Sequence, residues 1–526
     1  MEQGFRASMN WLHTWAGVVI GALLFAIFWM GTLSVFDREI DRWMMPMTRL
    51  APADTPVKLD TLRDVLLVQI GDKTVRQGFI TLPDERMTAA RIGYRGKDGF
   101  KNIRVNPANG EVLPEAGTLG GTGFIFPFHY SLHLRAGGVG YWLVGLAAMA
   151  MLALLVSGVI VHVKIFRDFF TFRTDKKTPR VALDLHNVTG VLALPFHFLI
   201  TLSGLIIFVT IYFPAAWSVA YDNDRQAFFD EAFGRYMRDK ADRPGTIGSL
   251  DAMAEQASAL WGGTRPYFLR IHHPGDANAY IEMRPSFQNR VTMSADRAYF
   301  DAASGALLHS QVSKPVLNAQ RFITGLHFIQ FRHWTLRWVY FALGLSGCVL
   351  IVTGFLFWLE SRRKRHAQQG LSGVRIVEGL TIGGTTGIIF ATLGFFIVNR
   401  VLPLGLEHRA EIEFWAFFAI WVLSFAHAWL RTRRGWIEQC CAVAAAALLA
   451  VLLNAITTGD HMLRTLVRGD WAVFGMDALL LAGGAIALAT AIRLHRRLHR
   501  RQAAAQKTAP SAARVIRADA PERQHA

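Results

Sequence analysis

The chain has 526 residues and a mass of 58.7 kDa; 52% of the residues are apolar, only 18% are charged, and the mean hydropathy is +0.26. Soluble globular chains carry about 25% charged residues, so this composition, with only three cysteines, excludes disorder, collagen-like repeats and a disulfide scaffold. The formal net charge of +17 would suit nucleic acid, but nothing else in the sequence supports such a partner, and we expect none.

Apolar runs divide the chain. A spanning helix needs about 20 apolar residues, and eight segments approach this length: 14–36, 139–162, 188–213, 335–359, 378–398, 413–430, 439–458 and 471–492. The sixth is short and the eighth contains Asp477, so these two are the weakest candidates. We therefore predict an α-helical integral membrane protein in a lipid bilayer.

The basic residues indicate the orientation. Lys and Arg collect after the second, fourth, sixth and eighth segments, as in ESRRKRH and RLHRRLHRRQ. Because cytoplasmic loops carry the excess of Lys and Arg, we predict that both chain ends are cytoplasmic. Most of the positive charge is then a signal of topology and an attraction to anionic lipids.

Two long polar segments, 37–125 and 214–320, both fall on the outer side in this topology. Each contains runs that alternate as strands do, so each predicts a small α+β domain. In chain order, we expect a first helix (1–36), an outer domain (37–125), a second helix (126–165), a cytoplasmic loop with a third helix (166–213), a second outer domain (214–320), a fourth helix (321–360), a module of about four helices (361–498) and a disordered tail (499–526).

The first 360 residues contain a repeat. LHTWAG at 12–17 returns as LHNVTG at 185–190, SLHL at 131–134 returns as GLHF at 325–328, and VSGVIVHV matches VTGFLFWL in the second and fourth spans. Residues 10–165 and 183–360 therefore look like two copies of one unit. Because duplicated membrane units pack about a pseudo-twofold axis, two helices from each copy predict a four-helix bundle.

The repeat selects four histidines. His13 corresponds to His186 at the cytoplasmic end, and His133 corresponds to His327 at the outer end. Two imidazoles that face each other across a bundle axis are the arrangement that holds a six-coordinate haem iron. Two such pairs predict two haems b, bound non-covalently because no CxxCH motif is present.

Other histidines compete for these positions. His162 ends the second span and could replace His13 or His186, His129 lies one helical turn before His133, and His197 lies deeper in the third span. We keep His197 as a possible iron ligand, propionate contact or relay. The simpler alternative is that a histidine near the interface only extends its polar tip to water or bonds a neighbouring helix.

These residues resemble the PepSY-associated transmembrane family of bacterial inner-membrane proteins. The likeness rests on LHTWAG, SLHL, LHNVTG and GLHF, together with Gly31-Thr32 and three [ST]-Gly pairs, Ser157-Gly158, Ser203-Gly204 and Thr353-Gly354, and it covers about residues 5–365. It implies two periplasmic PepSY-type domains and implies that the four paired histidines are haem ligands.

Some members of that family are haem-containing reductases of ferric siderophores. The resemblance therefore implies an inner-membrane di-haem oxidoreductase that reduces a ferric siderophore or other iron chelate in the periplasm, with a quinol or a cytoplasmic reductase as the electron donor. The alternative is a membrane-anchored PepSY protein without cofactor or enzymatic activity that binds or regulates a periplasmic peptidase.

Overall fold

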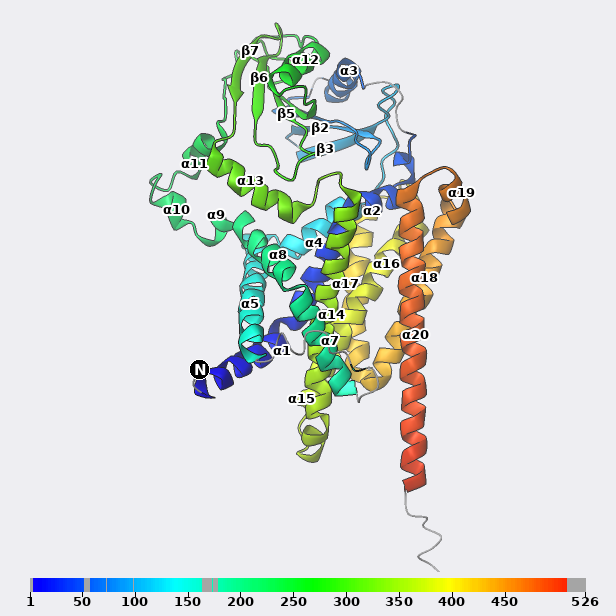
Figure 1. Cartoon of the computed structure of the whole chain (residues 1–526). Helices are drawn as coiled ribbons and strands as arrows, with labels where there is room; N and C mark the ends of the chain where they lie inside the picture. Colours follow the sequence, from blue (N-terminus) through cyan, green and yellow to red (C-terminus); the bar gives the residue numbers. More distant parts are fainter. Residues whose placement is uncertain are drawn as a thin grey trace, which may run out of the picture.

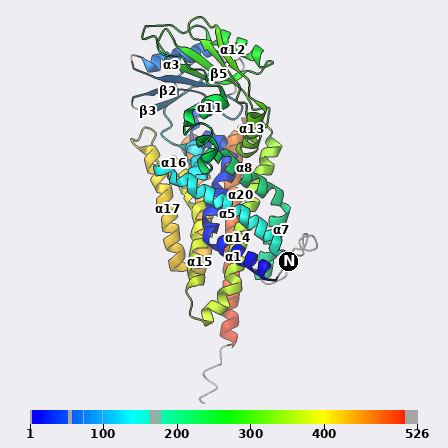
Figure 2. The same cartoon turned by 90° about the vertical axis from the view of Figure 1, so that its left-hand side faces the viewer.

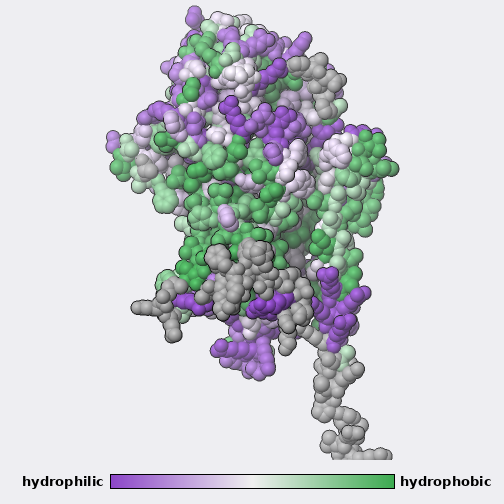
Figure 3. Space-filling view, viewed as in Figure 1, coloured by the Kyte–Doolittle hydropathy of each residue, from purple (hydrophilic) through white to green (hydrophobic). Residues whose placement is uncertain are grey.

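The membrane part of the protein is built from long apolar helices. The computed structural model describes residues 3–51, 57–71, 73–97, 99–162, 173 and 178–508. In this part, seven helices are long and apolar enough to cross a membrane, or eight if a bent pair counts as one span. They match the eight predicted segments, and a hydrophobic belt surrounds them between hydrophilic ends (Figure 3). The prediction of an α-helical integral membrane protein is confirmed.

The first four spans form a four-helix bundle. Helix α1 (Gln3–Ser34) packs against both α5 (Val139–Val161) and α14 (Trp334–Gln368). Helix α14 packs against α7 (Thr178–Leu192), and α5 packs against α8 (Leu194–Ile207). Each copy of the repeat thus contributes one helix before its outer segment and one after it, as the predicted pseudo-twofold bundle requires (Figure 2).

The third span is broken, whereas its counterpart in the first copy is straight. Residues Pro179–Leu192 and Leu194–Ile207 are bent by 64° around Ala193. Pro195 stands in the first turn of α8, where its missing N–H group does not cost a hydrogen bond. The first copy has Ala22 at the equivalent position, and α1 continues through it as a regular helix.

The two outer segments share a single sheet. They were predicted as two separate α+β domains, but their strands form one antiparallel sheet in the order β3-β2-β1-β4-β5-β6-β7 (Figure 1). The join is the pairing of β1 with β4, in which Phe79 lies opposite Arg270. Each half alone would leave an unpaired edge strand, and the pairing removes that liability. The strands are β1 (Gln77–Thr81), β2 (Ala90–Gly96), β3 (Gly99–Val105), β4 (Pro266–His272), β5 (Tyr280–Pro285), β6 (Arg297–Asp301) and β7 (Leu307–Gln311).

Two helices cover one face of this sheet, and each caps the N-terminus of the other. Asp251 in α12 (Leu250–Leu260) accepts hydrogen bonds from the backbone N–H groups of Leu59 and Asp60 at the start of α3 (Leu59–Ile70). In return, Asp60 accepts a bond from the N–H of Leu250. A carboxylate at a helix N-terminus satisfies unpaired donors and the helix dipole. The pseudo-twofold relation therefore extends into the outer part.

Short helices connect the sheet to the bundle. The helix α2 (Asp37–Met44) directly follows α1, and α4 (Phe126–Ser131) and α13 (Pro315–Phe328) lead into α5 and α14. The remaining short elements are η1 (Pro46–Thr48), η2 (Gly121–Ile125), η3 (Ala136–Gly138), α9 (Val209–Tyr212), α10 (Ala215–Ser218) and α11 (Arg225–Phe233).

The C-terminal helices pack against α1 and α2 of the first copy, and the first of them also packs against α14 of the second. Their elements are α15 (Gly373–Ile382), η4 (Gly383–Gly387), α16 (Ile388–Val401), α17 (Arg409–Arg431), α18 (Arg433–Thr458), α19 (Met462–Val467) and α20 (Trp471–Thr508). Asp477, which weakened the prediction of the eighth span, is buried and accepts a hydrogen bond of 2.8 Å from Trp43 Nε1. Helix α20 continues to Thr508, into the predicted tail 499–526; residues 509–526 lie outside the described residues.

A buried arginine fastens the sheet to the membrane helices. Arg86, in the loop from β1 to β2, donates to both carboxylate oxygens of Glu39 in α2, at 2.8 and 2.7 Å, and to Asp37 at 3.1 Å. Burial would raise the pKa of Glu39, but the charge of the Arg86 guanidinium outweighs burial and holds that pKa below its ordinary value. The ion pair therefore stabilises the junction at any pH at which Glu39 is ionised.

Replacing Arg86 tests this junction. We expect Arg86→Met to lower the free energy of unfolding by about 3–5 kcal/mol, because it removes the cation that contacts buried Asp37 and Glu39 and leaves Glu39 only the longer, 3.5 Å ion pair with Arg337. The loss should be present above pH 4.5 and shrink as the pH falls below it, since protonated Glu39 needs no counter-charge. Thermal unfolding in detergent measures this. The control is Arg332→Met at the exposed pair with Glu85, expected to cost less than about 1 kcal/mol; equal effects would contradict the role of Arg86.

Candidate functional site

The first predicted histidine pair is formed. His13 of α1 and His186 of α7 face each other with their ring centroids 6.2 Å apart and their planes at 82°. Nδ1 of His13 lies 3.0 Å from the carbonyl oxygen of Leu154 in α5. Nδ1 of His186 lies 2.9 Å from the carbonyl oxygen of Leu350 in α14. Leu154 and Leu350 occupy equivalent positions in the two copies, so the pair obeys the repeat down to its hydrogen bonds.

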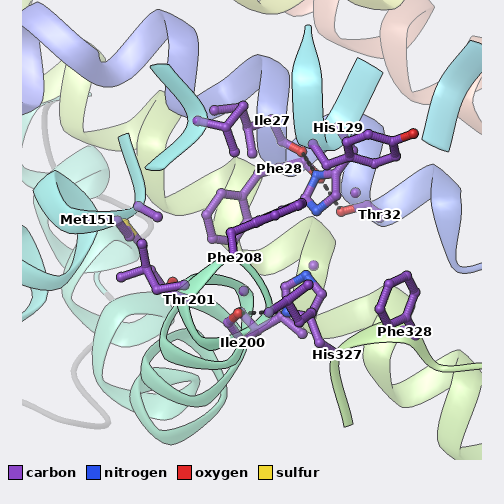
Figure 4. A pocket seen from close by; sticks show the side chains of 18 of the residues that line it. Ile27, Phe28, Thr32, His129, Met151, Ile200, Thr201, Phe208, His327 and Phe328 are labelled. Atoms are coloured by element: carbon purple, nitrogen blue, oxygen red, sulfur yellow. Dashed lines mark hydrogen bonds between the residues drawn. The ribbon is translucent and has the colours of Figure 1, made fainter. Parts of the chain in front are cut away.

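The second pair is formed by His129 and His327. Their rings are stacked, with centroids 5.9 Å apart and an angle of 25° between the planes. Nδ1 of His129 lies 2.9 Å from the carbonyl oxygen of Ile27 in α1, and Nδ1 of His327 lies 2.9 Å from that of Ile200 in α8 (Figure 4). Ile27 and Ile200 are again equivalent in the repeat. Both pairs therefore follow one geometric rule.

His133, which the repeat had paired with His327, lies elsewhere. Helix α4 ends at Ser131, and Leu132 and His133 both adopt left-handed backbone conformations. The ring of His133 turns away from the bundle axis, stacks 4.8 Å from that of Phe124, and donates from Nε2 to the carbonyl oxygen of Phe124. The pairing of His133 with His327 is thus corrected to His129 with His327. The match of SLHL with GLHF was displaced by one helical turn.

The two other candidates lie outside the pairs. His197 in α8 is fully buried, its Nε2 is 3.3 Å from Ser346 Oγ, and its Nδ1 has no hydrogen-bond partner among the described residues. His162 caps the end of α5, and its Nδ1 is likewise buried without a partner in the described part of the chain. Within the described residues, no ring contact joins either histidine to a member of a pair. Their predicted roles as ligands or relays stay predictions.

The hydrogen bonds fix the tautomer of the four paired imidazoles. A carbonyl oxygen only accepts hydrogen bonds, so each Nδ1 must carry the proton and donate it. Nε2 then keeps a lone pair, and among the described residues no hydrogen bond reaches Nε2 in any of the four rings. An imidazole oriented by an Nδ1–H donor bond, with Nε2 open, is the form that binds a metal.

Four glycines make room for these rings. A Cβ atom on Gly158 or Gly354 would lie 3.1 or 3.2 Å from Cε1 of His13 or His186. On Gly31 or Gly204 it would lie 2.7 or 2.9 Å from Cε1 of His129 or His327. Each of these glycines belongs to the repeated Gly31-Thr32 or [ST]-Gly pattern. The glycines admit the ring, and the adjacent Ser157 and Ser203 bring a hydroxyl within 3.1 Å of Nδ1 of His13 and His327.

The spacing of the rings fits a metal with two axial imidazoles. A metal–imidazole bond is about 2 Å long, so two rings on opposite sides of one ion have centroids about 6 Å apart. The observed separations are 6.2 and 5.9 Å. In the described part of the chain, no group of three or more His, Cys, Asp or Glu side chains could hold a metal. The described residues thus offer two imidazoles at each site, and a macrocycle such as haem would have to supply the other four ligands.

An apolar cavity adjoins the second pair. Its empty volume is about 1050 Å³, a figure that includes the space open to solvent. It lies between the helices of both copies, and the rings of His129 and His327 line it (Figure 4). Apolar side chains such as Leu24, Met151 and Phe208 make up most of its surface. The residues therefore fit a flat hydrophobic cofactor that reaches both imidazoles.

The comparisons with known proteins identify the family. The model of the PepSY-associated TM region matches residues 10–361. The chain belongs to this family. An uncharacterized protein of Pseudomonas aeruginosa is 26% identical over 373 residues, which are 67% of this chain and 90% of that protein. The family match ends at the close of the four-helix bundle, so the two copies of the repeat are the family's unit and the C-terminal helices lie beyond it.

Replacing a glycine of the family pattern tests the packing of the rings. We expect Gly31→Ala to destabilise the protein by about 1–3 kcal/mol, because the new methyl group would overlap the ring of His129. Gly17→Ala in the same helix is the matched control, since its Cβ would meet only Leu154 at 3.8 Å; a gain of helix propensity of about 1 kcal/mol is expected there. Thermal unfolding in detergent compares the two. Equal stability would contradict the close contact between Gly31 and His129.

Proposed function

We propose that this PepSY-associated membrane protein is a di-haem b oxidoreductase that passes electrons across the bacterial inner membrane and reduces a ferric iron chelate in the periplasm. The observation that carries the proposal is the presence of two facing imidazole pairs, each with both Nδ1–H groups bonded to backbone carbonyl oxygens and both Nε2 atoms open. A histidine that only reaches for water would not need this geometry twice.

The positions of the pairs suit transfer across the bilayer. His13 lies 14 residues before Ile27 on α1, which is about 21 Å at 1.5 Å per residue. One pair is therefore near the end of the bundle where the basic clusters lie, and the other is near the end below the sheet. With the predicted cytoplasmic location of the basic end, electrons would enter at His13 and His186 and leave at His129 and His327.

Haem bound at both pairs would supply one-electron transfer. The chain's own contribution is to hold each imidazole as a neutral ligand, to leave space beside it with a glycine, and to surround the site with apolar side chains. Ligand identity, hydrogen bonding and burial set the reduction potential of such a site. The Nδ1–H bonds to Leu154, Leu350, Ile27 and Ile200 raise the electron donation of the rings, because a polarised Nδ1–H makes Nε2 more basic.

The chemistry of iron supports a chelate as the acceptor. Siderophores bind ferric iron through hard oxygen donors and hold ferrous iron much less well, so one electron releases the metal. The electron donor on the cytoplasmic side would be a quinol or a cytoplasmic reductase. The C-terminal helices pack against α1 and offer a surface for either donor.

Haem content distinguishes the ligand assignments. We expect the purified protein, made with sufficient haem, to contain about two haems b per chain by the pyridine haemochrome assay. His129→Ala and His327→Ala should each remove one haem, and His13→Ala and His186→Ala the other. His133→Ala is the matched control and should keep both, because His133 is bonded to Phe124 and lies off the axis. Colourless wild-type protein would reject the oxidoreductase and favour the peptidase-binding alternative; loss of haem from His133→Ala alone would reject the pairing.

A transfer assay tests the direction. Proteoliposomes that enclose a membrane-impermeant reductant should reduce an external ferric chelate, detected with an external ferrous-specific chromogenic ligand. Both His13→Ala and His129→Ala should lower the rate to that of liposomes without protein, because each interrupts the same path. Reduction that persists in His13→Ala at the wild-type rate would show that electrons do not pass through the first pair.

A further inference from the structure

The second face of the sheet turns toward the membrane helices. Side chains alternate between the two faces of a strand, and α3 and α12 cover the face that carries Ile80, Ile92 and Leu269. The opposite face lies on the side of the bundle (Figures 1 and 2). On β6 and β7 this face is covered, because α11 supplies Phe233 beneath Arg297 at 5.6 Å. On β1 to β3 it stays open.

The strand register collects arginines on this open face. One row across the sheet runs through Arg104, Arg91, Thr81, Phe268 and Arg284. The next row runs through Asn102, Gly93, Phe79, Arg270 and Glu282. With Arg95 and Arg297, six arginines from five strands point to the same side as only two carboxylates, Glu282 and Asp301.

The charges on the open half are not neutralised. Glu282 is shared by Arg270, Arg284 and Arg297, and Asp301 is paired with Arg238. Among the described residues, no carboxylate lies within ion-pairing distance of Arg91, Arg95 or Arg104. Asp41 of α2 is the carboxylate that attracts Arg104 electrostatically, but it forms no ion pair with it. The oxygens of Asp41 instead accept hydrogen bonds from the Thr122 hydroxyl and the N–H of Gly121. An excess of guanidinium groups therefore faces this space.

A hollow lined with aromatic rings lies among these arginines. Its empty volume is about 450 Å³, including open solvent, and its walls include Phe79, Phe100 and Phe268 as well as Arg91 and Arg270. Phe79 and Phe100 meet edge to face at 5.1 Å, and Phe100 is 55% exposed. Gly93 lines the hollow between these walls and has no side chain to fill it. The exposed ring of Phe100 lies in the same hollow as Arg91, whose guanidinium has no carboxylate partner among the described residues, and this combination suits a ligand that is both aromatic and anionic.

We propose that this hollow, lined by Phe79, Phe100, Phe268, Arg91 and Arg270, with Arg104 beside it as the cross-strand neighbour of Arg91, binds a ferric chelate whose iron is held by anionic aromatic oxygen donors of the catecholate or phenolate class. The rings of the ligand stack on the phenylalanines, and its negative charge meets the guanidinium groups, which form strong charge-assisted bonds with such oxygens. The inference rests on the proposed function, because it names the chelate that the reductase accepts. A neutral or cationic hydroxamate chelate without rings lacks both attractions.

Binding to the full-length protein in detergent tests this. The probe is the ferric complex of 2,3-dihydroxybenzoate, with the iron-free acid and ferric acetohydroxamate as comparison ligands, and quenching of tryptophan fluorescence gives the affinity. We expect the double variant Arg91→Gln/Arg104→Gln to bind the ferric dihydroxybenzoate complex at least about tenfold more weakly. Phe79→Leu should also weaken it. Lys101→Gln is the matched control on β3, because Lys101 points to the other face; it should bind as the wild type does.

Three results would overturn the inference. One is equal affinity of wild-type and double-variant protein for the ferric dihydroxybenzoate complex. The second is equal or tighter binding of ferric acetohydroxamate. The third is that phosphatidylglycerol in nanodiscs displaces the complex while the double variant loses binding of the lipid but not of the complex. The hollow would then be a lipid site.

Failure of this inference is separable from failure of the proposed function. The haem content of the double variant should equal that of the wild type, since its substitutions are outside the bundle. Wild-type protein without haem that still binds the chelate would reject the reductase and keep the binding site. If the wild-type protein contains two haems but binds the chelate no more tightly than the Arg91→Gln/Arg104→Gln variant does, the binding site is rejected and the reductase is kept.

Discussion

The hydrogen bond from an imidazole Nδ1–H to a helix carbonyl oxygen, made four times, is the contact on which the arrangement of the bundle depends. It joins α1 to α5 through His13 and Leu154, and α7 to α14 through His186 and Leu350. At the other end it joins α4 to α1 and α13 to α8. Each bond lies within one copy of the repeat, whereas each pair of rings meets between the copies. The bonds thus fix every ring from its own copy, and among the described residues they leave each Nε2 atom without a hydrogen bond.

This contact also explains why small residues recur at fixed places. A carbonyl oxygen that already accepts its helical hydrogen bond can accept a second one only if the donor ring comes close to the backbone. Gly31, Gly158, Gly204 and Gly354 permit that approach. The [ST]-Gly pattern is therefore a requirement of ring placement, and the adjacent hydroxyls of Ser157 and Ser203 help to orient two of the four rings.

Much of this structure can be predicted from the sequence, and the exceptions have physical causes. Hydropathy locates all eight spans, and the repeat identifies His13 and His186 as partners. The assignment of His133 fails because the helix before it ends at Ser131, and the sequence SLHL does not reveal which of two histidines one turn apart is inside the helix. The single sheet is missed because the pairing of β1 with β4 joins residues about 190 apart, and neither outer segment alone indicates it. The arginine-rich face likewise emerges only from the register across that join.

The reciprocal capping of α3 and α12 has a consequence for the relation between the two halves of the fold. Asp60 caps the N-terminus of α12, which carries Asp251, and Asp251 caps the N-terminus of α3, which carries Asp60. Such a reciprocal contact, in which each helix caps the N-terminus of the other, is typical of an isologous interface between identical subunits. The two halves therefore meet as the subunits of a twofold dimer do, but because one chain carries both, each half can diverge from the other. The bend at Pro195 in one half, and the docking of η4 on Ala22 at the equivalent place in the other, are such divergences.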